Sequence, residues 1–177
     1  ANARERVRGE SRRGNSLVHV MVIRGIHDAP SQGVFTAPVT LFGKVTVLKK
    51  SPTTKRALER QDDALALITR VAKQVEPLMK EHDWKVGELT EILPAQAGLG
   101  GWNLNRGTKI ALRLRPHNAP DTLLPFDHVL SVMCHELSHM KHSSHSAAFY
   151  AFLAELEEAV AKLQAKGVYG LGSFETE

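Results

Sequence analysis

The sequence predicts an α+β fold, in which a small β-sheet packs against helices in one compact domain. Two hydrophobic periods support this prediction. Apolar residues alternate with polar or small ones over 108–115, which is typical of a half-buried strand. Over 55–81 they recur every three or four residues, which is typical of an amphipathic helix. The chain has 177 residues, of which 42% are apolar and 24% charged, so it can build one core, and collagen-like or wholly disordered classes are excluded.

Shorter patterns predict the other strands. Apolar runs rich in β-branched residues indicate strands at 17–23, 39–49 and 86–93. Glycines predict a turn at 98–101, before Trp102. Within the 108–115 strand, the alternation places Arg113 and Arg115 together on the exposed face.

The helices are predicted from their periods and their ends. Pro77 is expected to kink or loosen the last turn of the 55–81 helix. A second helix is expected over 126–141. A third begins after Ser146, which is a good N-cap, and ends at Gly167.

Charge is distributed unevenly around a net value of +4. Residues 1–60 contain 12 Lys and Arg against 4 Asp and Glu, which indicates a surface for a polyanion or a solvated basic tail. We therefore predict a basic, partly disordered arm over 1–38 that includes the 17–23 strand, a folded domain over 39–170 and a tail over 171–177. No apolar run approaches the roughly 18 residues of a membrane span, so no membrane partner is expected.

One motif carries the chemistry: His135-Glu136-Leu137-Ser138-His139 has the form H-E-x-x-H. On a helix, the two histidines lie about 40° apart and about 6 Å along the axis, so both can bind one zinc ion. Glu136 is rotated by about 100° from His135, which places it beside the metal as a general base for a zinc-bound water.

Catalytic zinc usually has three protein ligands and one open position. His145, ten residues after His135, is the predicted third ligand, and Ser143-Ser144 gives the break that lets the chain turn. Three neighbours have alternative interpretations. Cys134 is either a buried core residue or a regulatory thiol, which as the single cysteine suits a reducing compartment. His142 is interpreted as a surface residue or a partner of the ligands, and Tyr150 as packing or as a donor to the substrate carbonyl.

The basic N-terminal third contains candidate phosphate contacts. Trp102, beside the glycine-rich turn, either stacks on a base of single-stranded DNA or belongs to the core. The candidate DNA-binding residues are Lys44, Lys49, Lys50, Lys55, Arg56 and Trp102.

From Val45 onward the chain resembles the WLM metalloproteases, which are related to Spartan and the SprT-like proteases. The segments that carry this resemblance are 44–48, 75–79, 84–91, 103–107, 110–115 and 133–145, continued through Phe149-Tyr150. They span about 120 residues in the expected order. Where the family usually has Gly-Pro before its third histidine and Asp after it, this chain has Ser143-Ser144 and Ser146.

The resemblance implies a small zincin-like fold over 39–170 that binds Zn²⁺ through His135, His139 and His145 and uses Glu136 as base. It implies a DNA-dependent zinc endopeptidase that cleaves proteins crosslinked to DNA, in the nucleus. Single-stranded or distorted DNA is the expected activator. SUMO, ubiquitin and an AAA segregase are further expected partners, through regions outside this chain.

Two other functions are compatible with the residues. One is a zinc peptidase that does not depend on DNA, with the basic arm as a solubility or localisation device. The other is a DNA-binding module with a structural zinc, which would need a fourth ligand such as His142.

Overall fold

The computed structural model describes residues 40–168 and 170. The arm predicted over 1–38, the strand predicted at 17–23 and the tail predicted over 171–177 lie outside these residues. Within them, the chain forms four strands and three helices, which confirms the predicted α+β class. Along the described part of the chain, no helix has the length and apolar character that a membrane crossing requires.

The sheet has the order β1-β2-β4-β3 and is mixed. Strands β1 (Phe42–Thr46), β2 (Val86–Ile92) and β4 (Lys109–Arg113) run parallel, and β3 (Gly101–Leu104) pairs antiparallel with β4. Strand β3 therefore forms one edge of the sheet.

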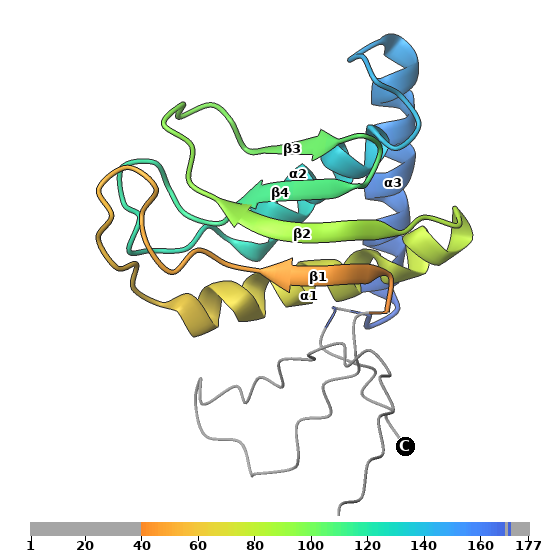
Figure 1. Cartoon of the computed structure of the whole chain (residues 1–177). Coiled ribbons are helices and arrows are strands. Elements are labelled where there is room, and N and C mark those ends of the chain that lie inside the picture. Colours follow the sequence, from red (N-terminus) through yellow and green to blue (C-terminus); the bar gives the residue numbers. More distant parts are fainter. Residues whose placement is uncertain (1–39, 169, 171–177) are drawn as a thin grey trace, which may run out of the picture.

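The three helices gather on one face of the sheet (Figure 1). Helix α1 (Gln61–Glu81) connects β1 to β2, while α2 (Phe126–Ser138) and α3 (Ala147–Ala165) follow β4. Apolar side chains of all three helices share one core with the inward-facing residues of the strands. This core holds α2 against β3 and β4, and so it sets the position of the motif that runs from His135 to His139.

Helix α1 begins at Gln61, six residues later than predicted. Residues 50–57 form a tight loop instead, in which the Ser51 N–H donates to the Arg56 carbonyl over 2.8 Å. Arg60 then adopts a left-handed conformation (φ 55°), which cannot continue a helix. At the other end, the helix extends through Pro77 to Glu81, as the 55–81 range predicts.

Two predictions about the 98–115 region were wrong. The turn predicted over 98–101 ends in a strand, because Gly101 already pairs with Leu112. Arg113 and Arg115, predicted to be exposed, are both buried. The Arg115 guanidinium bonds Glu91 over 2.7 Å and two backbone carbonyls, so these protein groups replace solvent around most of it.

Candidate active site

Helix α2 positions the first two histidines of the motif. His135 and His139 lie one turn apart near its C-terminal end, and their ring centroids are 5.1 Å apart. The opposite side of the same helix is apolar and packs into the core through Met133 and Leu137. Burial of that side fixes the rotation of the helix and leaves both imidazoles facing outward from the core.

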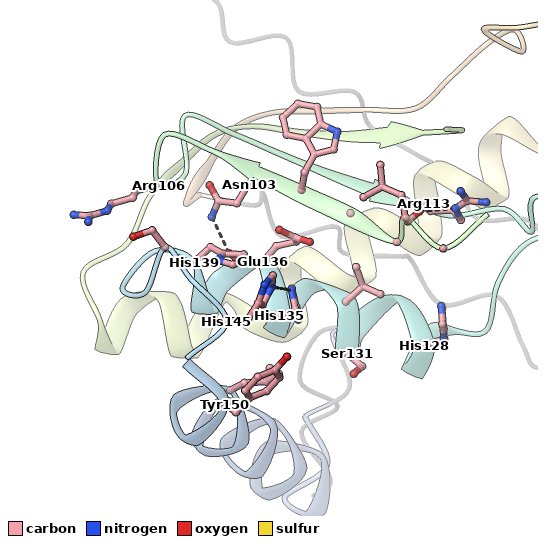
Figure 2. A pocket seen from close by; sticks show the side chains of 18 of the residues that line it. Asn103, Arg106, Arg113, His128, Ser131, His135, Glu136, His139, His145 and Tyr150 are labelled. Carbon is pink, nitrogen blue, oxygen red and sulfur yellow. Dashed lines mark hydrogen bonds between the residues drawn. The ribbon is translucent and has the colours of Figure 1, made fainter. Parts of the chain in front are cut away.

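A turn after α2 returns the chain to these histidines. Helix α2 ends at Ser138, three residues earlier than predicted, and the N–H of His142 donates to the Ser138 carbonyl. Ser146 then caps α3, since its hydroxyl accepts from the Phe149 N–H. His145, just before this cap, lies with its Nε2 3.0 Å from the Nε2 of His135, as Figure 2 shows.

The three imidazoles form one potential metal-binding group. Their candidate ligand nitrogens all lie within 4.8 Å of one another. The Nδ1 of His139 is 2.9 Å from the backbone carbonyl of His142. Because a carbonyl only accepts, Nδ1 carries the proton and Nε2 presents its lone pair. Burial, together with the two neighbouring histidines, lowers the pKa of His135, which favours the neutral, metal-binding form.

The ring of Phe149 packs against the imidazole rings of all three histidines. Its ring centroid lies 4.9 Å from His135, 4.7 Å from His139 and 4.8 Å from His145, and the side chain is completely buried. From the sequence, Phe149 was named only in the segment that carries the family resemblance. One sequence signal could have indicated this role. Phe149 lies three residues after the Ser146 cap, in the first turn of α3, where its ring is directed toward the turn that contains His145.

Glu136 lies beside the histidines and is 4% exposed. Burial raises the pKa of its carboxyl to about 7. A β-carbon at Gly101 on β3 would lie 2.9 Å from Oε1 of Glu136, so the absence of a side chain at this position makes room for the carboxylate.

The site opens into a cleft of about 1080 Å³ between α2, α3 and the β3 edge. Two residues that were both missed as functional candidates shape its wall: Asn103 on β3 and Arg113 at the end of β4. Asn103 bonds the backbone carbonyl of Glu136, and Arg113 bonds the carbonyls of Pro94, Gln96 and Leu99, which holds the loop before β3 in place. The 103–107 segment quoted for the resemblance was the only sequence signal for Asn103.

The three neighbours of the motif, Cys134, His142 and Tyr150, have different environments in the structure. Cys134 is buried in the core, and burial together with the Glu157 carboxylate raises the pKa of its thiol to about 12. The His142 ring packs edge-on against Phe152, and only its carbonyl reaches the ligands. Tyr150 is 55% exposed, lines the cleft and has its ring 6.3 Å from that of His145.

The candidate DNA-binding residues are not brought to one place. Trp102, on β3, is half-buried and lines the cleft. The other candidates are exposed but do not line it; they lie on β1 and the loop that follows: Lys44, Lys49, Lys50, Lys55 and Arg56. The Arg56 guanidinium is bound to both carboxylate oxygens of Asp121, at 2.9 and 2.6 Å.

The arrangement fits a catalytic metal centre. Three imidazoles face one point, a carboxylate stands beside them, and the remaining side is open to the cleft. Among residues 40–168 and 170, no fourth His, Cys, Asp or Glu joins the group. A structural zinc site would normally be closed by four ligands.

Comparison with known proteins gives consistent results. A family model described as the WLM domain matches residues 42–177. The DNA-dependent metalloprotease WSS1 of Saccharomyces cerevisiae is 37% identical over 126 residues, which cover 71% of this chain and 44% of that protein. Its homolog in Schizosaccharomyces pombe is 38% identical over 109 residues, covering 62% and 40%. The chain thus spans less than half the length of these curated relatives.

Solved structures show the same fold. The crystal structure of Wss1 from Saccharomyces cerevisiae superimposes with a TM-score of 0.68 at 35% identity and covers 74% of this chain and 97% of that one. The crystal structure of Wss1 from Schizosaccharomyces pombe gives a TM-score of 0.58 at 27% identity, covering 70% and 96%. These matches confirm the predicted fold.

Proposed function

This chain belongs to the WLM-domain family, and we propose that it is a DNA-dependent zinc endopeptidase that cleaves proteins crosslinked to DNA. The observation that carries this proposal is the convergence of three imidazoles beside a buried carboxylate in an open cleft. The two curated relatives, both named DNA-dependent metalloproteases, support the same reaction class. The open cleft suits substrates of varied sequence.

Zinc is the proposed metal because three imidazoles with one open side are a usual donor set for catalytic zinc. When bound, zinc would polarise the scissile carbonyl and lower the pKa of a water to about 7. The chain itself supplies the arrangement: the carbonyl of His142 fixes the tautomer of His139, and Phe149 supports the three rings.

Glu136 is the proposed general base. Its carboxylate would accept a proton from the attacking water and return it to the leaving amine nitrogen. The raised pKa of about 7 suits both steps, because the group can gain and lose a proton near neutral pH. Tyr150, exposed in the cleft, is the proposed donor of a hydrogen bond to the substrate carbonyl.

DNA is proposed to bind through the exposed basic residues of β1 and its following loop, with Trp102 as a stacking platform for a single-stranded base. Arg56 would have to leave Asp121 to contact a phosphate, so Lys49 and Lys50 are the stronger contacts. A nuclear location and the partners SUMO, ubiquitin and an AAA segregase belong to the same proposal and are supported by the family resemblance.

The test is cleavage of a basic DNA-binding protein by zinc-loaded enzyme, with and without single-stranded DNA. Glu136→Gln is expected to lower the rate by about 10²–10⁴-fold, the usual contribution of a general base. Glu155→Gln makes the same chemical change at an exposed position of α3 and should leave the rate unchanged. Removing zinc with a chelator should abolish cleavage, and added zinc should restore it.

The same assay separates the alternatives. Cleavage that is equal with and without DNA would indicate a zinc peptidase without DNA dependence. Zinc binding without cleavage under either condition would indicate a DNA-binding module with a structural metal. In the proposed enzyme, the stimulation by DNA should fall steeply as salt rises, because phosphate contacts release counterions.

A further inference from the structure

The C-terminal end of α2 leaves the backbone carbonyl of Glu136 without its usual partner. In a continuing helix, the N–H of Met140 would donate to the carbonyl of Glu136. Here it donates to Leu137 instead, over 2.9 Å, because the helix ends at Ser138 and the chain tightens into a turn. The carbonyl of Glu136, the proposed base, is therefore free to accept a bond from outside the helix.

Asn103 on β3 donates that bond. Its Nδ2 lies 2.7 Å from the Glu136 carbonyl, across 33 residues of sequence, and Figure 2 shows the side chain directed at this point of the helix. Its Oδ1 accepts from the N–H of Gly107 over 2.8 Å. Because the first partner can only accept and the second can only donate, the orientation of the amide is fixed.

The hairpin that Asn103 closes packs directly onto the segment after the motif. Gly107 has a φ of 96°, and a β-carbon there would lie 2.7 Å from the Cε of Met140. Two residues before Asn103 on the same face of β3, Gly101 lies against the Glu136 carboxylate. The carboxylate of Glu136 faces β3, and the amide of Asn103 bonds the backbone of Glu136 to the same strand.

We propose that Asn103 is a positioning residue that holds Glu136 at a fixed distance from β3 and so aims its carboxylate at the attacking water. This inference rests on the proposed peptidase function. The hydrogen bonds of the Asn103 side chain go to the Glu136 carbonyl, the Met140 sulfur and the Gly107 N–H, so it acts through the backbone of Glu136 and not through its carboxylate. A misplacement of a catalytic group by about 1 Å can lower the rate by about 10²-fold, so the loss of a positioning hydrogen bond should slow the reaction.

Asn103→Asp tests the proposal with the smallest change. The aspartate keeps the oxygen that accepts from Gly107 but places a second oxygen against the Glu136 carbonyl instead of a donor. In the zinc-loaded, DNA-activated enzyme, we expect kcat to fall about 10–100-fold, the loss usual for groups that orient a metal site. We expect KM and zinc affinity to stay within about 3-fold, because the ligand side chains and the cleft are unchanged.

Asn118→Asp is the matched control, since it makes the same change on an exposed loop away from the cleft, and it should keep the wild-type kcat. Unchanged kcat in Asn103→Asp would overturn the proposal. So would a loss of kcat that is matched by an equal loss of zinc affinity or of folded protein, because that pattern marks a merely structural residue. If the wild-type enzyme itself cleaves nothing, the proposed function fails first.

A second measurement does not depend on activity. In the metal-free protein, the side-chain amide of Asn103 should exchange its bonded proton with solvent more slowly than that of the exposed Asn118, by NMR. Equally fast exchange of the two amides would show that the bond to Glu136 is not maintained in solution, and would also overturn the proposal.

Discussion

The two sides of the cleft are held in place by different means. On the α2 side, helical geometry alone sets His135 and Glu136 next to each other, and core packing fixes the helix rotation. On the β3 side, the wall depends on contacts between segments more distant in sequence, such as the bond from Asn103 to Glu136 and the bond from Arg113 to Leu99. The α2 side should therefore tolerate changes that do not touch a functional group, whereas the β3 side should respond to small changes of shape.

The largest expected effect on the β3 side follows the substitution Gly101→Ala. The added β-carbon would lie 2.8 Å from the Ala111 carbonyl and 2.9 Å from Glu136 Oε1, so strand and carboxylate must separate. We expect peptidase activity to fall by about 10²-fold and the free energy of unfolding to fall by about 1–3 kcal/mol. Rates at saturating substrate and urea denaturation measure the two effects.

Gly98→Ala provides the control, because nothing lies within 4 Å of a β-carbon built at Gly98. Its unfolding free energy should stay within about 0.5 kcal/mol of wild type, as for an ordinary surface change. If both alanine variants behave alike, the β3 side is more adaptable than its contacts indicate, and the contrast between the two sides of the cleft is lost.

The same contrast explains what the sequence could and could not predict. The spacing of His135, Glu136 and His139 is local, so the sequence could predict that these three side chains lie together on one helix. The burial of Arg115 could not be predicted. Alternation along a strand does not reveal that Glu91 and two backbone carbonyls lie where they accept hydrogen bonds from the guanidinium. Strand β3 was missed for a similar reason: its glycine looked like a turn, and only its pairing with β4 makes it a strand.

The next effect, on stability alone, is expected from the charge of Glu136 in the metal-free protein. Its carboxyl has a pKa of about 7 when folded and near 4.5 when unfolded. Between these values, the folded state binds a proton that the unfolded state has released, so the unfolding free energy should fall as pH rises from about 4.5 to 7. Glu136→Gln lacks this term and should be about 3 kcal/mol more stable than wild type at pH 8.

Thermal unfolding of both metal-free proteins from pH 5 to pH 8 measures this difference. The two stabilities should be similar at the acid end and diverge toward pH 8. Parallel curves would mean that the carboxylate is solvated or paired in the folded protein, and that burial does not raise its pKa. Because glutamine has nearly the same size and shape as glutamate, the result tests the charge of Glu136 and not its packing against β3.

The smallest expected effect concerns the tip of the β3–β4 hairpin, and it has the opposite sign. Arg106 is exposed at the cleft with a φ of 51°, a left-handed conformation that costs a side-chain-bearing residue about 1 kcal/mol. Arg106→Gly should therefore be about 0.5–1 kcal/mol more stable than Arg106→Ala, which loses the same side chain but keeps the strain. Denaturation midpoints of the two variants isolate this backbone term. If glycine gives the less stable protein, the hairpin tip is relaxed. If glycine gives the more stable protein and both variants are less active than the wild type, the strained arginine contributes to the activity of the cleft and not to the stability of the fold.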